Sequence, residues 1–152
     1  MLHKKAKLVF NDTETEPKLH DIGEEILPRG ANAKEGARAD IRIKGYLRPQ
    51  QNSYFYVQII NIQSQCHEKL HPRNAMKKSE ERKEQMYKDR IENVDGGTFI
   101  PLIFTTKGAR SYKTSKTITK LGSMIAIKKK ERMCETIKKS SDQKKAPKRG
   151  LT

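Results

Sequence analysis

Hydrophobic and polar positions alternate in the first half of the chain with the two-residue period of β-strands. Residues 37–46 alternate small or apolar residues with polar ones, which predicts a strand ending near Gly45. Residues 54–62 are aromatic and β-branched, which also predicts a strand, and a turn over residues 48–53 separates the two segments. We therefore expect these two strands to form an antiparallel hairpin.

Two further apolar stretches predict strands outside this hairpin. Residues 7–10 read Lys-Leu-Val-Phe and predict a short strand. Residues 98–106 predict a strong one, and Pro101 within it indicates a sheet edge or a bulge because proline cannot donate to a ladder. Residues 11–36 are polar and rich in Pro and Gly, which predicts a long irregular loop.

Helical periodicity replaces strand periodicity at residue 74. Residues 74–94 contain many helix formers and no Gly or Pro, which predicts a helix. Four positions at helical spacing predict the inward face: Lys83, Tyr87, Ile91 and Val94. The glycines at 96 and 97 predict the end of this helix.

A second helix is predicted over residues 112–130, and the pattern permits an extension to residue 137. Its expected inward residues are Ile118, Leu121, Met124 and Ile125. The element order is then strand, long loop, hairpin, helix, strand, helix. This order predicts one α/β domain over residues 1–137, with a small mixed sheet of about three or four strands flanked by helices. Residues 138–152 are expected to form a disordered basic tail.

Charge is distributed unevenly along the chain, whose net charge is +15. Residues 1–106 contain 18 Lys and Arg against 15 Asp and Glu, a net charge of +3. Residues 107–152 contain 15 against 3, a net charge of +12. A cationic segment of this kind binds phosphate backbones through counterion release, which favours nucleic acid as the partner. A solvated surface without a partner is the alternative interpretation.

Cysteine usage and targeting signals favour an intracellular protein. Cys66 and Cys134 do not form a CxxC pair, and unpaired thiols fit a reducing compartment. Cys66, His67 and His71 are too few for the four ligands of a structural zinc site. We expect no membrane span and no secretory signal. The basic runs at 128–130 and 144–149 fit either a nuclear localisation signal or a plain basic tail.

Asp40 lies inside a predicted strand, where a carboxylate is either functional or on the exposed face of the hairpin. A strand Asp, a hairpin, a second strand, a helix and a third strand resemble the core of PD-(D/E)XK nuclease-like domains. The likeness is to the branch found in mobile-element, retrotransposon-associated open reading frames, and it covers about residues 12–130. The stretches that carry it are 16–19, 37–41 with 45–46, 54–59 with Asn61, 87–94 and 97–104.

This resemblance implies a site in which two acidic residues hold Mg²⁺ and a basic residue orients the attacking water. Asp40 matches the first acid, and it is the surviving metal ligand. Tyr56 stands where the second acid belongs, and Gln58 stands where the basic residue belongs. The chain therefore resembles a catalytically inactive nuclease remnant that binds nucleic acid, with DNA favoured over RNA. Relatives of this kind carry more chain before the first strand, so a fragment or a decayed copy is expected.

Two alternative functions remain open from the residues. An active Mg²⁺-dependent endonuclease would need a migrated ligand beside Asp40, and Glu16 is the first candidate, followed by Glu24, Glu25 or Glu80. A small RNA-binding protein would need Tyr54 and Tyr56 exposed for base stacking, although aromatics at alternate strand positions usually belong to the core. The residues expected to contact nucleic acid are Arg38, Lys83, Arg90, Lys128, Lys129 and Lys130.

Overall fold

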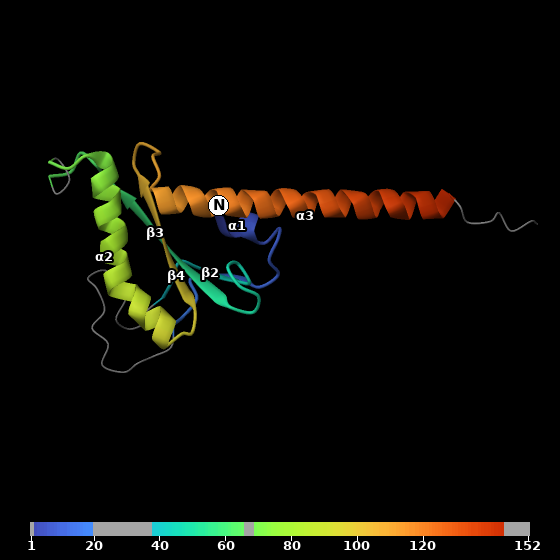
Figure 1. The fold of residues 1–152 in the computed structure, drawn as a ribbon, viewed down its shortest axis with the longest axis horizontal. Helices are drawn as coiled ribbons and strands as arrows, with labels where there is room; N and C mark the ends of the chain where they lie inside the picture. The colour runs from blue at the N-terminus through green and yellow to red at the C-terminus, as the bar shows by residue number, and fades with distance from the viewer. Residues whose placement is uncertain (1, 20–37, 66–68, 145–152) are drawn as a thin grey trace, which may run out of the picture.

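The computed structural model describes residues 2–19, 38–65 and 69–144 (Figure 1). The elements follow the order α1 (Leu2–Ala6), β1 (Thr13–Thr15), β2 (Ile41–Lys44), β3 (Asn52–Ile60), α2 (Pro72–Asn93), β4 (Thr98–Thr105) and α3 (Tyr112–Lys144). None of the helices within these ranges is long and apolar enough to span a membrane.

The four strands form one mixed sheet in the order β1-β2-β3-β4. β1 and β2 pair antiparallel, as do β2 and β3, whereas β3 and β4 are parallel. A parallel pair needs a crossover connection, and α2 provides it. The predicted α/β class, the mixed sheet and the antiparallel hairpin are therefore confirmed.

The predicted strand at residues 7–10 is wrong. Residues 2–6 form helix α1, and turns follow it, because the backbone N–H groups of Val9 and Phe10 both donate to the carbonyl of Ala6. Ala6 is fully buried, and Phe10 packs edge-on against Tyr46 with 6.2 Å between ring centroids. Packing with residues distant in sequence thus overrides the local β-propensity.

The predicted irregular loop over residues 11–36 is wrong at its start, since Thr13–Thr15 form β1 against β2. The part of that loop from residue 20 onwards lies outside the described residues. β2 is also shorter than predicted and covers only Ile41–Lys44, while β3 begins two residues before the predicted start. Both differences lie at the ends of elements, where local patterns are least informative.

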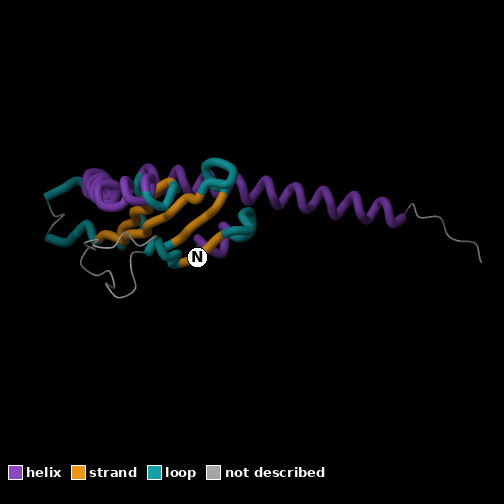
Figure 2. The backbone as a smooth tube through the Cα atoms, turned by 90° about the horizontal axis from the view of Figure 1, so that it is seen from below, coloured by secondary structure: helices purple, strands orange, loops and turns teal. Residues whose placement is uncertain are grey.

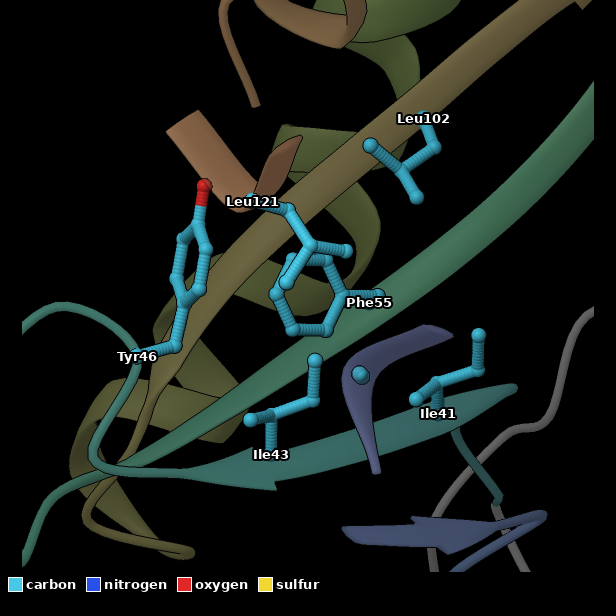
Figure 3. Close-up of a cluster of buried hydrophobic side chains, with 7 residues drawn as sticks. Ile41, Ile43, Tyr46, Phe55, Leu102 and Leu121 are labelled. Atoms are coloured by element: carbon cyan, nitrogen blue, oxygen red, sulfur yellow. The ribbon is translucent and has the colours of Figure 1, made fainter. Parts of the chain in front are cut away.

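One face of the sheet carries the main core cluster, which α1 and α3 cover (Figure 3). Side chains alternate between faces along a strand, so Phe55 points to this face while its neighbours in β3 point to the other. The cluster consists of Ala6, Ile41, Ile43, Tyr46, Phe55, Leu102 and Leu121. Met124 and Ile125 of α3 pack against it, as the helical spacing predicted.

Helix α2 covers the opposite face of the sheet. Its C-terminal part packs on a cluster that contains Tyr54, Tyr56, Ile91 and Phe99. Its N-terminal part packs through Ala75 and Met76 on the far ends of β3 and β4. The expected inward position of Val94 is wrong, because Val94 is the C-cap residue and is exposed.

The ends of α2 carry recognisable signals. His71 is the N-cap and its Nδ1 accepts a hydrogen bond from the Arg73 N–H at 3.3 Å, while Pro72 occupies the first turn. After the helix, Gly97 packs so closely on β3 that an added Cβ would lie 2.5 Å from the ring of Tyr54. Only glycine fits there. Gly97 therefore allows the segment between α2 and β4 to pack directly against β3.

β4 is an edge strand, as Pro101 predicted. Near its C-terminal end, the N–H and carbonyl of Ile103 point away from β3 and bond to the start of α3. The Ile103 N–H donates to the Thr114 Oγ1 at 2.8 Å, and the Ile103 carbonyl accepts from the Ser111 N–H. Ser111 also caps the helix, because its Oγ accepts a hydrogen bond from the Thr114 N–H. This buried network holds the first turn of α3 on β4.

Helix α3 is much longer than predicted. It runs through Lys144, so the prediction of a disordered tail is wrong for residues 138–144, and residues 145–152 lie outside the described part. Leu121 is its last buried residue, and every side chain from 126 to 141 is exposed. The outer part of α3, from residue 126 to residue 144, therefore projects from the sheet as a single helix (Figure 2). We call this segment the arm, and the rest of the described chain the body.

Candidate functional site

Asp40 lies directly before β2 and extends the pairing of β2 with β3. Its backbone N–H donates to the Phe55 carbonyl at 3.1 Å. Its carboxylate Oδ2 accepts a hydrogen bond from the Val57 N–H at 2.6 Å, in place of a backbone carbonyl. Asp40 is exposed to solvent. One of its carboxylate oxygens is nevertheless already bound to β3, the strand that carries Tyr56 and Gln58.

Tyr56 occupies the α2-facing side of β3, next to Asp40. Its ring stacks on Tyr87 of α2 with centroids 4.5 Å apart, and it also lies 5.4 Å from the ring of Phe99. The hydroxyl is buried and has no hydrogen-bond partner among the described residues. Burial raises the pKa of Tyr56, with a further contribution from Tyr87, so the phenol stays protonated at neutral pH.

Lys83 closes this aromatic cluster from the α2 side. Its ammonium lies 5.2 Å from the ring centroid of Tyr87 and 5.9 Å from that of Tyr56, within the range of cation–π attraction. Burial lowers the pKa of Lys83, and the nearby charge of Asp40 partly opposes this shift. Lys83 therefore belongs to the site, yet its charge is directed at the tyrosine rings.

The side chain of Arg90 is largely buried and pairs with Asp95. Its Nη1 lies 3.4 Å from the Oδ2 of Asp95, and the two side chains are only 8% and 1% exposed. The guanidinium is committed to this largely buried ion pair, which does not favour the expected contact with nucleic acid, and that contact stays a prediction. Nothing in the local sequence signals that Asp95 pairs with Arg90.

Glu16 and Arg38 lie on the other side of Asp40. The Glu16 N–H donates to the Asp40 carbonyl at 2.9 Å, and Glu16 has a positive φ of 50°. Its carboxylate forms a long ion pair with Arg38, with 3.8 Å between Oε2 and Nη1. The fold thus brings Glu16 and Arg38 close to Asp40 in space, but the charges of Glu16 and Arg38 pair with each other.

Gln58 and Glu80 complete the positions considered from the sequence. Gln58 follows Tyr56 on the same face of β3 and is half-buried, but an amide carries no charge. Glu80 of α2 is buried, and its Oε1 has no hydrogen-bond partner within the described ranges. Glu24 and Glu25 lie outside those ranges, as do Cys66 and His67.

These residues do not fit a Mg²⁺ ion. Mg²⁺ requires several oxygen ligands in near-octahedral geometry. Across residues 2–19, 38–65 and 69–144, no three His, Cys, Asp or Glu side chains come together as a metal site would require. Asp40 offers a carboxylate with one oxygen already bonded to Val57, and the protonated phenol of Tyr56 is a poor ligand.

The strand tyrosines are unavailable for base stacking. Tyr54 and Tyr56 are each 5% exposed, which confirms that they belong to the core. An RNA-binding surface that stacks bases on β3 would need these rings in solvent. The alternative of a sheet-based RNA-binding protein therefore loses the feature that would have favoured it.

The arm carries several exposed positive charges. Lys128, Arg132 and Lys139 are exposed and lie on one face of α3, because they are spaced by four and then seven residues, and the exposed Glu135 lies between Arg132 and Lys139 on that face. Lys129 and Lys130 are exposed on other faces of the same helix. Sequence reasoning named Lys128 to Lys130 but missed Arg132 and Lys139, which the helical spacing of basic residues would have revealed.

Comparison with known proteins leaves the chain without an assigned family. No protein-family model, no curated protein and no solved structure matches it.

Proposed function

We propose that this protein binds nucleic acid, DNA in preference to RNA, through the basic face of the arm, and that its body does not cleave the bound strand. The exposed row of Lys128, Arg132 and Lys139 is the observation that carries this proposal. A helix with cations on one face can follow a phosphate backbone without reading base sequence.

The charge distribution supports the arm as the binding element. Residues 107–152 contain 15 Lys and Arg against 3 Asp and Glu, whereas the rest of the chain is almost neutral. In the body, Arg90 and Arg38 are paired with carboxylates. In the arm, Lys128 lies 4.0 Å from Glu131, an exposed contact of little energetic weight. The exposed cations of α3 are therefore available to phosphates, and they lie in the part of the chain that has few acidic residues.

The order of elements and the content of the site support a non-cleaving nuclease-like body. Asp40 directly precedes β2, β3 carries Tyr56 and Gln58, and α2 and a parallel β4 follow, which is the order that the resemblance to PD-(D/E)XK domains implies. A buried phenol and an uncharged amide replace the second acid and the base. Without these groups, neither metal binding nor activation of water is expected.

Salt dependence of binding is the direct test. A labelled DNA duplex is titrated with the full chain at increasing salt, and binding is followed by fluorescence anisotropy. We expect affinity to fall steeply with salt, with a slope of about 0.9 per phosphate contacted. A flat salt response would contradict the proposal. An RNA duplex of the same sequence tests the preference, and tighter RNA binding would contradict that part alone.

Variants locate the binding surface. Lys128→Gln, Arg132→Gln and Lys139→Gln together should reduce the salt slope by up to about 3. The matched control removes the same number of charges from the exposed side of α2, by Lys77→Gln, Lys78→Gln and Lys88→Gln. The control should retain the wild-type slope. Equal losses from both variants would show that binding depends on net charge and not on the arm.

Cleavage of supercoiled plasmid in the presence of Mg²⁺ or Mn²⁺ tests the body. The wild type and Asp40→Asn should both be silent, and the double change Tyr56→Asp with Gln58→Lys should gain activity if the fold is that of a nuclease. A wild type that cuts while Asp40→Asn does not would show that a migrated ligand, such as Glu16, completes the site. Circular dichroism is needed beside each assay because Tyr56 is part of the core.

A further inference from the structure

The arm exposes apolar side chains that no described part of the chain covers. Met133 and Ile137 are 58% and 66% exposed, although both are large hydrophobic residues. A single helix projecting into water gains nothing from apolar groups on its surface, and its own stability is marginal without packing. Apolar groups gathered on such a helix mark a surface that another molecule covers.

These side chains belong to one face that runs along most of α3. Spacings of four, four, three, four and four residues place its members in a row. They are Ile118, Gly122, Ala126, Lys129, Met133 and Ile137. Within the row, the small residues Gly122 and Ala126 follow Ile118, and the large side chains of Met133 and Ile137 lie towards the tip. The basic row of Lys128, Arg132 and Lys139 occupies another side of the helix.

Gly122 has no function within the folded chain that the structure reveals. A glycine in a helix interior costs roughly 0.5–1 kcal/mol relative to alanine. A Cβ at this position would meet nothing within 4 Å, so packing inside the monomer does not require glycine. Small residues at 122 and 126 instead permit a second helix to approach the backbone of α3 closely.

An apolar cavity of about 570 Å³ opens at the body end of the same face. Ile118 and Gly122 line it together with Ile125 of α3 and with Leu2 and Leu8 at the N-terminal segment. Leu8 is half exposed, which leaves the mouth of the cavity open. The face therefore begins at an apolar hollow and ends in large apolar side chains.

We propose that two copies of this chain pair through this face, with their α3 helices antiparallel. In this register Met133 of one copy lies over Gly122 of the other, and Ile137 lies against Ile118 at the mouth of the cavity. Ala126 then faces the aliphatic stem of Lys129. Each contact occurs twice, as the two-fold symmetry of an isologous interface requires.

Self-complementarity is the reason for choosing a second copy as the occupant. The hollow and the side chains that fill it lie on the same helix, at positions that coincide when the helix is reversed on itself. The paired segment covers about 20 residues, or about 30 Å at 1.5 Å per residue. The positive arms repel each other, so pairing should strengthen as salt screens that repulsion.

Sedimentation equilibrium of the full chain, freed of nucleic acid, tests the pairing. We expect a mass of twice 17.5 kDa that shifts to the monomer on dilution. Met133→Glu with Ile137→Glu should yield a monomer, and both positions are exposed, so the fold should survive. Ile127→Glu is the matched control, because Ile127 is 60% exposed on the same helix but lies off the face. A monomeric wild type, or a dimer that the double substitution leaves intact, would overturn the proposal.

Disulfide trapping tests the register. In a Cys66→Ser, Cys134→Ser background, Gly122→Cys with Met133→Cys should form a covalent dimer on oxidation, and Met133→Cys alone should not. Cross-linking by Met133→Cys alone would indicate parallel pairing and would overturn the antiparallel register. Neither experiment includes nucleic acid, so its outcome is independent of the function proposed above.

Discussion

The ring of Tyr56 stacks on the ring of Tyr87, with 4.5 Å between centroids and 21° between planes. This stack joins β3 to α2 at the position where a nuclease-like site would need an acid. Tyr56→Asp should therefore destabilise the fold by about 3–5 kcal/mol, as truncation of a buried aromatic usually does. Urea denaturation measures the loss. Tyr112→Asp is the control, since Tyr112 is exposed in the first turn of α3, where an acid is tolerated.

Two buried tyrosines should respond oppositely to loss of their hydroxyl groups. The hydroxyl of Tyr56 lacks a partner in the described structure, whereas that of Tyr46 donates to the Thr117 carbonyl at 3.2 Å. An unsatisfied buried polar group costs about 1–3 kcal/mol. Tyr56→Phe should thus raise the free energy of unfolding, and Tyr46→Phe should lower it by about 1 kcal/mol. Losses of equal size in both variants would mean that the Tyr56 hydroxyl is bonded.

Stability should fall at alkaline pH. Burial raises the pKa of Tyr46, Tyr54 and Tyr56 above the ordinary value of 10.0. The folded protein then retains protons that the unfolded chain releases, so this contribution is complete below about pH 10 and is lost as pH rises through the folded pKa values. Lys83 acts oppositely. Burial lowers its pKa, so the folded protein releases this proton before the unfolded chain does, and the free energy of unfolding rises as pH approaches 10.5.

Urea denaturation at a series of pH values between about 8 and 11 measures this effect, and tyrosinate absorbance reports the ionisation itself. Tyr56→Phe should make the alkaline decline shallower than in the wild type. A decline that is unchanged in Tyr56→Phe would exclude Tyr56 as a major contributor.

The buried pair of Arg90 and Asp95 should be sensitive to loss of one partner. Asp95→Asn removes the charge that lies 3.4 Å from the guanidinium and leaves Arg90 buried with less compensation. The expected loss is about 3–5 kcal/mol, the usual cost of breaking a buried ion pair. Glu84→Gln is the control, since its pair with Lys113 is exposed and should contribute at most about 1 kcal/mol. Equal losses in the two variants would contradict the assignment.

The sequence predicted those features that depend on local pattern. The alternation in β2 and β3, the helix formers of α2 and the proline of β4 each gave the correct element, with errors only at the ends. The segment around Leu8 and Phe10 was misassigned because its packing on Tyr46 and α3 is long-range. β1 was missed because three polar residues form it, and only the partner strand makes them a strand.

The candidate site was predictable in its residues and not in their pairing. Asp40 directly precedes β2 and Tyr56 lies on β3, the neighbouring strands of the predicted hairpin, whereas the position of Lys83 over the ring of Tyr56 was not predicted. No local signal indicates that Arg90 binds Asp95 or that Glu16 pairs with Arg38, because those contacts depend on how α2 and the first strand meet the sheet. The length of α3 was underestimated because its polar, charged outer half was interpreted as a tail.

The edge of β4 has a consequence for self-assembly in the β direction. Backbone groups of alternate residues point to the same side of a strand, so Pro101 points outward like Ile103, and proline has no N–H to offer there. The outward groups of Ile103 are already bonded to Ser111 and Thr114. An incoming strand would find few free donors along this edge, and the opposite edge is a strand of only three residues. The β4 edge is thereby a poor template for an added strand, which disfavours amyloid-like stacking along it.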